Sequence, residues 1–372
     1  MRFTPKYILS EIVKWTEYGL QRGVIYLMRL FIKRRRATPT VDFHSAKILF
    51  LRQNQIGDTL VSTPIFAALK RCYPTITLDV LLDRRNASVL DGDPNIRKRY
   101  VIKQTRFDVF TALRDIRRER YDIVVDLIHS ASSTSTLFCL FAQASFYIGF
   151  KRENDFIYNL ALAPNQHDRM LMQLAEVLKP FGIEPNAEEL QPYFYLPESA
   201  LAFSEKESAR LRGEGKFLIG INISASTELK FWGTEKFIRL IQSLHARYPD
   251  AQIVVMSSSA YRPKALEITR RSGALLARET KTLQEFAALI SALDMLVTPD
   301  SAAVHFADIF RVPSVILANT PAGTRQWYPS FTEFVSIHAP QLNLSSIPLE
   351  QAIEVCDRFV EKLTSEKPIL ER

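Results

Sequence analysis

The chain of 372 residues has little cysteine, and its three cysteines, Cys72, Cys139 and Cys356, lie far apart. Their spacing fits neither a disulfide framework nor a zinc motif, so the sequence favours a reducing compartment. No apolar run approaches the roughly 20 residues that a membrane-spanning helix needs. No small-residue cleavage site follows a compact apolar core near the start, so a cleaved signal peptide is not expected.

Net charge is nearly absent from most of the chain and concentrated at its start. Residues 1–36 hold nine Lys/Arg and two Glu, a net charge of +7 out of the chain's +8. A nucleic-acid groove on the remaining, nearly neutral residues is therefore not expected. Apolar residues of this segment fall at helical spacing: Leu20, Val24, Leu27 and Phe31. We expect residues 1–40 to form a basic amphipathic helix on an anionic membrane surface, the alternative being a helix packed on the protein's own body.

Beyond this segment, apolar runs alternate with helical patterns in two successive blocks, which predicts two α/β domains at 45–200 and 213–345. The expected strands are 47–52, 78–82, 100–102, 123–127, 146–148, 217–223, 252–257, 275–277, 295–298 and 314–318. The expected helices are 58–72, 109–118, 235–247, 263–272, 283–293 and a last one within the C-terminal segment 346–372. Residues 180–197, rich in proline and acidic residues, are expected to connect the two domains.

A polar loop ending in Gly57-Asp58 follows the first expected strand. Gly57 supplies the conformational freedom of a tight turn, and Asp58 then stands at a helix start above the carboxyl edge of a sheet. By itself Asp58 is a helix cap at least as readily as a catalytic carboxylate, and Thr63-Pro64 offers a competing helix start.

A second unit of strand, turn, helix and strand spans residues 295–318. The start of its helix offers free N–H groups and a favourable dipole to an anion. We expect Asp300 to cap this helix, and Ser301 and His305 to approach a bound phosphate. The alternative is an ordinary crossover connection with Asp300 as its cap.

A hydroxyl-rich loop after the strand 217–223 carries Ser224, Ser226 and Lys230. Hydroxyl donors and one lysine suit a diphosphate, although polar loops after strands are common. Trp232, which follows, is expected to be a packing anchor.

Together these stretches resemble glycosyltransferase family 9, the bacterial heptosyltransferases that build the inner core of lipopolysaccharide. The family's first signature is a strand, a polar loop, Gly-Asp, and a helix with Thr-Pro and a late Tyr-Pro. Its second is Asp-[Thr/Ser]-Gly-x-x-His, and a hydroxyl-rich loop followed by Lys-x-Trp precedes it. The residues that match are Gly57, Asp58, Thr63, Pro64, Tyr73, Pro74, Lys230, Trp232, Asp300, Ser301 and His305, with Ala302 in place of the usual glycine.

The resemblance implies the α/β GT-B fold: two Rossmann-like doubly wound domains facing a cleft, here with the N-terminal basic amphipathic helix added, and a last helix that often returns to the first domain. It implies transfer of heptose from ADP-heptose to the lipopolysaccharide core with inversion, no cofactor and no metal. Asp58 is then the candidate base that takes the acceptor's proton. The donor's diphosphate is expected to contact Ser224, Ser226, Lys230, Asp300, Ser301, Ala302 and His305.

The family's acceptors are anionic sugars, so basic residues after the strands of the first half are candidate acceptor contacts. These are Arg52, Arg84, Arg85, Lys151 and Arg152. Each is alternatively a solvated surface charge. His129 is a weaker candidate, and the hydroxyl run from Ser130 to Thr136 is either a polar contact region or a helix cap.

Three alternatives remain at this point. The same fold with a different nucleotide-sugar donor fits equally well, and a catalytically degenerate, membrane-bound scaffold protein is possible. A dinucleotide oxidoreductase is disfavoured because the Gly-x-Gly-x-x-Gly turn is absent. The expected location is cytoplasmic, peripheral on the cytoplasmic face of the inner membrane.

Overall fold

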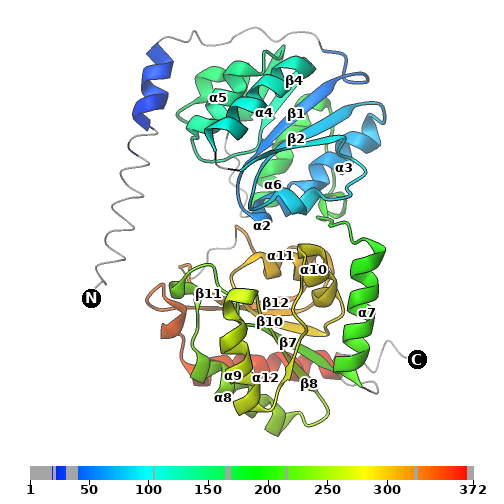
Figure 1. Ribbon diagram of the computed structural model, residues 1–372, viewed down its shortest axis with the longest axis vertical. Helices are drawn as coiled ribbons and strands as arrows, with labels where there is room; N and C mark the ends of the chain where they lie inside the picture. Colours follow the sequence, from blue (N-terminus) through cyan, green and yellow to red (C-terminus); the bar gives the residue numbers. More distant parts are fainter. Residues whose placement is uncertain are drawn as a thin grey trace. The chain divides into compact units, whose positions relative to one another are not determined.

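The computed structural model describes residue 19 and residues 22–30, 41–103, 105–163, 169–213, 217–321 and 326–366. The chain divides into two compact units, Met1–Leu190 and Gln191–Arg372. Each unit contains one six-stranded sheet whose paired strands are all parallel. Helices cover both faces of each sheet, as in a doubly wound fold (Figure 1).

The sheet of unit 1 has the strand order β3-β2-β1-β4-β5-β6. Its strands are β1 (Lys47–Arg52), β2 (Thr77–Asp83), β3 (Lys98–Ile102), β4 (Ile123–Asp126), β5 (Phe146–Phe150) and β6 (Leu160–Leu162). Its helices are α2 (Ile56–Leu60), α3 (Thr63–Cys72), α4 (Arg106–Glu119), α5 (Ser133–Phe141) and α6 (Met170–Ala175). The central strands β1, β4 and β5 are almost wholly buried, which explains their continuous apolar runs.

The sheet of unit 2 has the order β12-β11-β10-β7-β8-β9. Its strands are β7 (Leu218–Asn222), β8 (Gln252–Met256), β9 (Leu275–Leu276), β10 (Met295–Pro299), β11 (Ser314–Ala318) and β12 (Phe334–His338). Its helices are α7 (Glu198–Arg212), α8 (Thr234–Arg247), α9 (Arg262–Ser272), α10 (Leu283–Ser291), α11 (Ala302–Ile309) and α12 (Leu349–Glu366).

Every strand expected from the sequence is present, and 47–52 and 314–318 match β1 and β11 residue for residue. The expected helix 58–72 is instead two helices, α2 and α3, separated at Val61 and Ser62, with Pro64 in the first turn of α3. The two strands that the sequence analysis missed, β6 and β12, are half-buried edge strands with weak hydrophobic patterns.

The boundary between the units, after Leu190, lies inside the predicted connecting segment 180–197. Residues 198–212, which the sequence analysis left partly between domains, form α7 and pack on α10 of unit 2. The Ser204 hydroxyl donates to the Ala288 carbonyl across this contact at 2.5 Å. Helix α7 therefore belongs to unit 2, which begins before residue 213, where the second domain was predicted to start.

Helix α12 also differs from expectation, because its apolar face belongs to the core of unit 2 rather than to the first domain. Ala352, Cys356 and Val360 are buried there with residues of α8 and the sheet. Trp232 lies in the same core, fully buried, and its indole N–H donates to the Ile347 carbonyl at 3.2 Å. The prediction that Trp232 is a packing anchor is confirmed.

Residues 22–30 are helical, and the rest of the expected membrane segment lies outside the described residues apart from residue 19. Ile25 is 3% exposed and shares an apolar core with Ile116 of α4 and Cys139 of α5. Arg22 forms an ion pair with Glu153. One side of this helix therefore packs on the protein's own body, as the alternative interpretation held, while Tyr26, Leu27 and Leu30 are exposed.

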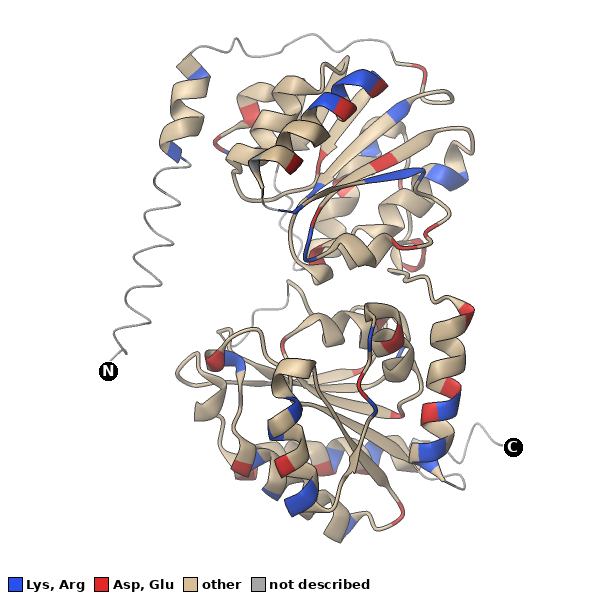
Figure 2. Ribbon diagram, viewed as in Figure 1, with Lys and Arg blue, Asp and Glu red and all other residues tan. Residues whose placement is uncertain are grey.

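Among the described residues, no helix combines the length and apolar character needed to cross a bilayer. In the part of the chain that the structure describes, lysines and arginines are interspersed with acidic residues, without one continuous basic band (Figure 2).

Candidate active site

The carboxyl edge of the unit 1 sheet gathers the polar loops that follow β2, β1, β4 and β5. These four strands are neighbours in the sheet, so residues far apart in sequence meet at this edge. The loops carry Arg84 and Arg85, then Asp58, then His129, and then Lys151 and Arg152.

Asp58 occupies the third position of α2 and caps that helix. Its carboxylate accepts from the Gln55 backbone N–H at 3.2 Å and from the Asn54 side-chain amide at 3.4 Å. Its side chain keeps 16% of its surface exposed. The capping prediction is confirmed, and the carboxylate still has surface through which it can meet a ligand.

Arg52 fixes the position of Asp58. Its guanidinium donates twice to the Asp58 carbonyl, at 2.9 and 2.7 Å, and its Nη2 lies 3.6 Å from the Asp58 carboxylate. It donates a further bond to the Leu127 carbonyl, which joins the loops after β1 and β4. Burial lowers the pKa of Arg52 to about 10, with the Asp58 and Asp126 carboxylates opposing that shift, so the group is a cation at neutral pH. Arg52 is thus not the solvated surface charge that the sequence allowed.

Asp126, at the end of β4, was missed by the sequence analysis. It is fully buried, pairs with Arg152 at 2.5 Å and accepts from the Tyr158 hydroxyl at 2.9 Å. Burial opposes the charge of Arg152, but Asp126 and Tyr158 outweigh it and raise its pKa. Arg152 is 4% exposed and so is also no solvated surface charge. The sequence did contain a signal for Asp126, because it ends the apolar run Ile123–Val125. A carboxylate at the end of a buried strand requires a partner.

His129 stacks on Phe150, with ring centroids 4.2 Å apart. Burial, together with the Arg52 and Arg152 cations, lowers its pKa to about 4, so the ring is neutral at pH 7. Among the described residues, neither ring nitrogen has a hydrogen-bond partner, and neither does the buried side-chain amide of Gln53. Buried polar groups in this condition are commonly satisfied by water or a ligand.

The remaining basic candidates are more peripheral. Arg84 and Lys151 are exposed, and Arg85 pairs with Asp83 at 2.9 Å. The hydroxyl run before α5 proves to be a cap region, with Ser132 accepting from the Ser135 N–H at 3.2 Å. A role of these basic residues in acceptor binding stays a prediction.

In unit 2, α11 begins directly after β10, at the carboxyl edge of the sheet and beside the loop that follows β7. Ser301, not Asp300 as predicted, is its N-cap, and its hydroxyl accepts from the Ala303 N–H at 3.3 Å. Asp300 instead binds a lysine: Lys230 Nζ lies 3.2 Å from its carboxylate and 3.1 Å from its carbonyl oxygen. The two side chains keep 27% and 24% of their surface exposed, so the lysine remains accessible beside the helix start.

The other predicted donor contacts surround this pair. Ser224 accepts from the Ser258 N–H at 2.7 Å, which joins the loops after β7 and β8, and Ser226 on the same loop is exposed. Ala302 is the first residue of α11. His305, one turn further, makes an edge-to-face contact with Trp327 at 6.3 Å. The structure therefore brings a lysine, hydroxyls and helix N–H groups to one edge of the unit 2 sheet, a combination that can bind a diphosphate.

Comparison with known proteins adds four findings. The model of glycosyltransferase family 9 (heptosyltransferase) matches residues 109–346, well over half of the chain. Lipopolysaccharide heptosyltransferase 3 of Escherichia coli is 23% identical over 347 residues, which cover 83% of this chain and 98% of that protein.

Two solved structures are similar in fold. The family 9 glycosyl transferase of Veillonella parvula has a TM-score of 0.72 at 17% identity, with 88% of this chain and 100% of that chain covered. E. coli heptosyltransferase WaaC, solved with ADP, has a TM-score of 0.67 at 14% identity, with 85% and 99% covered.

Proposed function

Since this chain belongs to glycosyltransferase family 9 and is a glycosyltransferase of the GT-B fold, we propose that it transfers a heptose from ADP-heptose to a lipopolysaccharide core acceptor, with inversion. The relative named a lipopolysaccharide heptosyltransferase supports the sugar and the acceptor class. The ADP in the similar WaaC structure supports the nucleotide. The proposal rests on what each unit shows by itself: an accessible, oriented Asp58 in unit 1, and Lys230 beside the start of α11 in unit 2.

Lys230 and the N-terminal N–H groups of α11 are proposed to hold the diphosphate of the donor. When the bond to the sugar breaks, negative charge develops on the leaving phosphate oxygens. A fixed cation and helix N–H groups stabilise that charge without reorganisation. Ser301 and His305 lie on the same helix start, and no metal is needed in this scheme.

Asp58 is proposed as the general base. In a single displacement, the acceptor hydroxyl attacks the anomeric carbon, its proton passes to the Asp58 carboxylate, and the ADP–sugar bond breaks. Attack from the face opposite to the leaving group inverts the anomeric centre. The anchoring of Asp58 by Gln55 and Arg52 keeps the carboxylate in one orientation, which general-base catalysis requires.

Thermal-shift measurements with ADP, UDP and GDP test the donor class and the scaffold alternative together. We expect ADP to raise the melting temperature most, since a ligand at one hundred times its Kd adds about 2.7 kcal/mol to the free energy of unfolding. A larger shift with UDP or GDP would favour a different sugar donor. Equal and negligible shifts with all three would favour the degenerate scaffold.

The N-terminal segment is proposed to attach the enzyme to the anionic cytoplasmic face of the inner membrane. The exposed side of the helix 22–30 offers Tyr26, Leu27 and Leu30, while Ile25 packs on the body. The basic run 33–36 follows in the sequence. An amphipathic helix next to a cluster of cations suits an interfacial attachment.

Replacing Lys33, Arg34, Arg35 and Arg36 together with glutamine is expected to weaken binding to anionic vesicles by at least about tenfold, because each basic residue near such a surface contributes about 1 kcal/mol. Vesicle cosedimentation measures the effect. A charge variant is preferable to deletion of residues 1–36, because deletion would also uncover the core that Ile25 fills. Unchanged sedimentation with the quadruple variant would remove the basic run from membrane attachment.

A further inference from the structure

A second basic site lies at the opposite edge of the unit 1 sheet from Asp58. A cavity of about 670 Å³ is lined by Arg114, Arg117, Arg118 and Arg120, together with Gln143 and Ser145. Residues 120–122 directly precede β4, and residues 143–145 directly precede β5, so the cavity lies at the amino edge of the sheet. The length of β4 separates it from the Asp58 edge by on the order of 13 Å.

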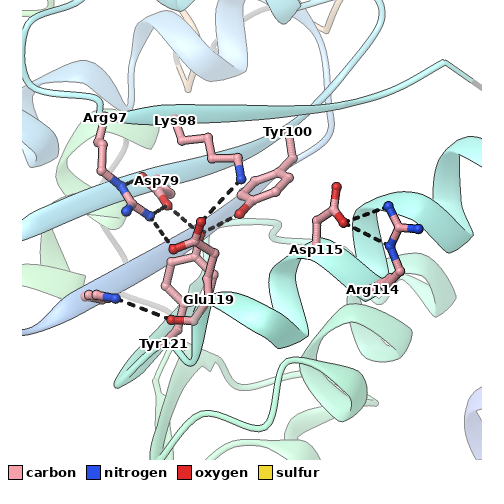
Figure 3. Close-up of polar contacts among 9 residues, drawn as sticks. Asp79, Arg97, Lys98, Tyr100, Arg114, Asp115, Glu119 and Tyr121 are labelled. Carbon is pink, nitrogen blue, oxygen red and sulfur yellow. Dashed lines mark hydrogen bonds and ion pairs between the residues drawn. The ribbon is translucent and has the colours of Figure 1, made fainter.

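The positive charge of this cavity is largely uncompensated. Its one carboxylate, Asp122, accepts from the Lys47 backbone N–H at 2.8 Å. The neighbouring Glu119 is engaged by Arg97 at 2.9 Å and by Lys98 at 3.3 Å (Figure 3).

Of the four arginines, Arg114 pairs with Asp115 on the surface at 3.1 Å (Figure 3). Arg117, Arg118 and Arg120 are exposed, and within the described ranges they have no ion-pair partner. Basic residues in a last helical turn complement the helix dipole, but that dipole amounts to about half a charge and cannot account for four arginines.

The lining of the cavity matches the chemistry of a phosphate ester. Guanidinium groups bind phosphate with paired N–H donors in a fixed fork. The Gln143 amide and the Ser145 hydroxyl add neutral groups that can hydrogen-bond ester or glycerol oxygens.

Exposed aromatic side chains on the same helix indicate that the phosphate is carried by a lipid. Phe107 and Phe110 of α4 are 76% and 66% exposed. Phe107 and Phe110 lie seven and four residues before Arg114, and Arg117 lies three residues after it. At this spacing the four side chains share one helix face. A helix face that combines aromatic rings with arginines is suited to the interface of an anionic membrane.

We infer that this face of α4 and its arginine cavity bind the phosphate headgroup of an anionic membrane lipid, with Phe107 and Phe110 inserted beside it. Helix 22–30 shares its apolar core with α4 and α5, so unit 1 would contact the membrane at two places. This site is independent of the donor and acceptor sites and of the proposed reaction.

Vesicle cosedimentation of the full chain tests the inference. The probes are vesicles of phosphatidylcholine with phosphatidylglycerol, and vesicles of phosphatidylcholine alone. Arg117→Gln/Arg118→Gln is expected to weaken binding to the anionic vesicles by about tenfold or more. Phe107→Ser/Phe110→Ser is expected to weaken binding at low and at high salt alike, because its contribution is apolar.

The matched control is Arg239→Gln/Arg270→Gln, which removes two exposed arginines from α8 and α9 and lowers the net charge equally. The inference is overturned if Arg117→Gln/Arg118→Gln weakens vesicle binding no more than this control does. The inference is also overturned if the arginine variant loses binding of free glycerol phosphate while its vesicle binding is unchanged, because that result indicates a site for a soluble anion. A phenylalanine variant that alters the sedimentation coefficient rather than vesicle binding assigns the face to a second copy of the chain and also overturns it. Thermal melts of each variant verify that the fold is intact.

Discussion

Replacing Asp58 with asparagine is expected to lower kcat by ~10²–10⁴-fold, the usual cost of losing a general base. Asparagine keeps a side-chain oxygen that can accept from the Gln55 N–H, so α2 remains capped. It loses the interaction with Arg52, and we expect the free energy of unfolding to fall by ~1 kcal/mol. Steady-state kinetics on a soluble acceptor fragment measure the first effect and thermal melts the second. Donor affinity is expected to stay unchanged.

The chain offers a matched control for this variant. Asp108 stands at the third position of α4 and accepts from the Thr105 N–H and hydroxyl, the same capping arrangement as Gln55 and Asp58. Asp108→Asn should therefore reproduce any stability loss that comes from the cap while leaving turnover normal. Near-normal turnover in Asp58→Asn as well would exclude Asp58 as the base and return it to a capping role alone.

Replacing Lys230 with alanine is expected to raise the Kd for ADP by ~10–150-fold, because a charge-assisted contact contributes ~1.5–3 kcal/mol. The substitution also leaves the Asp300 carboxylate without its nearby cation, so its repulsion of the diphosphate adds to the loss. Adenosine, which has no phosphates, should bind the variant as it binds the parent protein. Titration calorimetry with both ligands separates the two effects.

Lys236→Ala is the control for a lost lysine in the same unit. The Lys236 ammonium donates to the Ser345 and Ile347 carbonyls at 2.7 and 2.6 Å, and it lies on α8 rather than in the loop after β7. We expect this variant to bind ADP normally. A similar loss of affinity for adenosine and for ADP in Lys230→Ala would show that Lys230 shapes the loop instead of binding phosphate.

The two candidate half-sites are built in similar ways. In each unit a helix starts directly after a central strand, and a basic side chain engages the carboxylate at that start: Arg52 with Asp58, and Lys230 with Asp300. The difference lies in burial. Arg52 is 1% exposed and serves to orient its partner, whereas Lys230 is 27% exposed and can itself meet a ligand. This contrast supports Asp58 as the reacting group in unit 1 and Lys230 as the binding group in unit 2.

The sequence by itself determined most strands and most helices, because strands of a parallel sheet are continuous apolar runs and surface helices carry an apolar stripe. It also singled out Asp58, Lys230 and Ser301 as candidate site residues, because a Gly-Asp turn, a hydroxyl-rich loop and a helix start after a strand are patterns of residues only a few positions apart. The strands it missed, β6 and β12, are edge strands whose side chains are only partly buried, so their pattern is faint.

Only the tertiary structure decided which distant residues meet. Asp126 and Arg152 pair because β4 and β5 are neighbours in the sheet, and Lys230 reaches Asp300 because β7 lies beside β10. In the same place Ser301 caps α11, while the Asp300 carboxylate contacts the lysine. Whether a polar side chain caps its own helix or engages a distant partner depends on strand order and burial, and neither is a property of the local sequence.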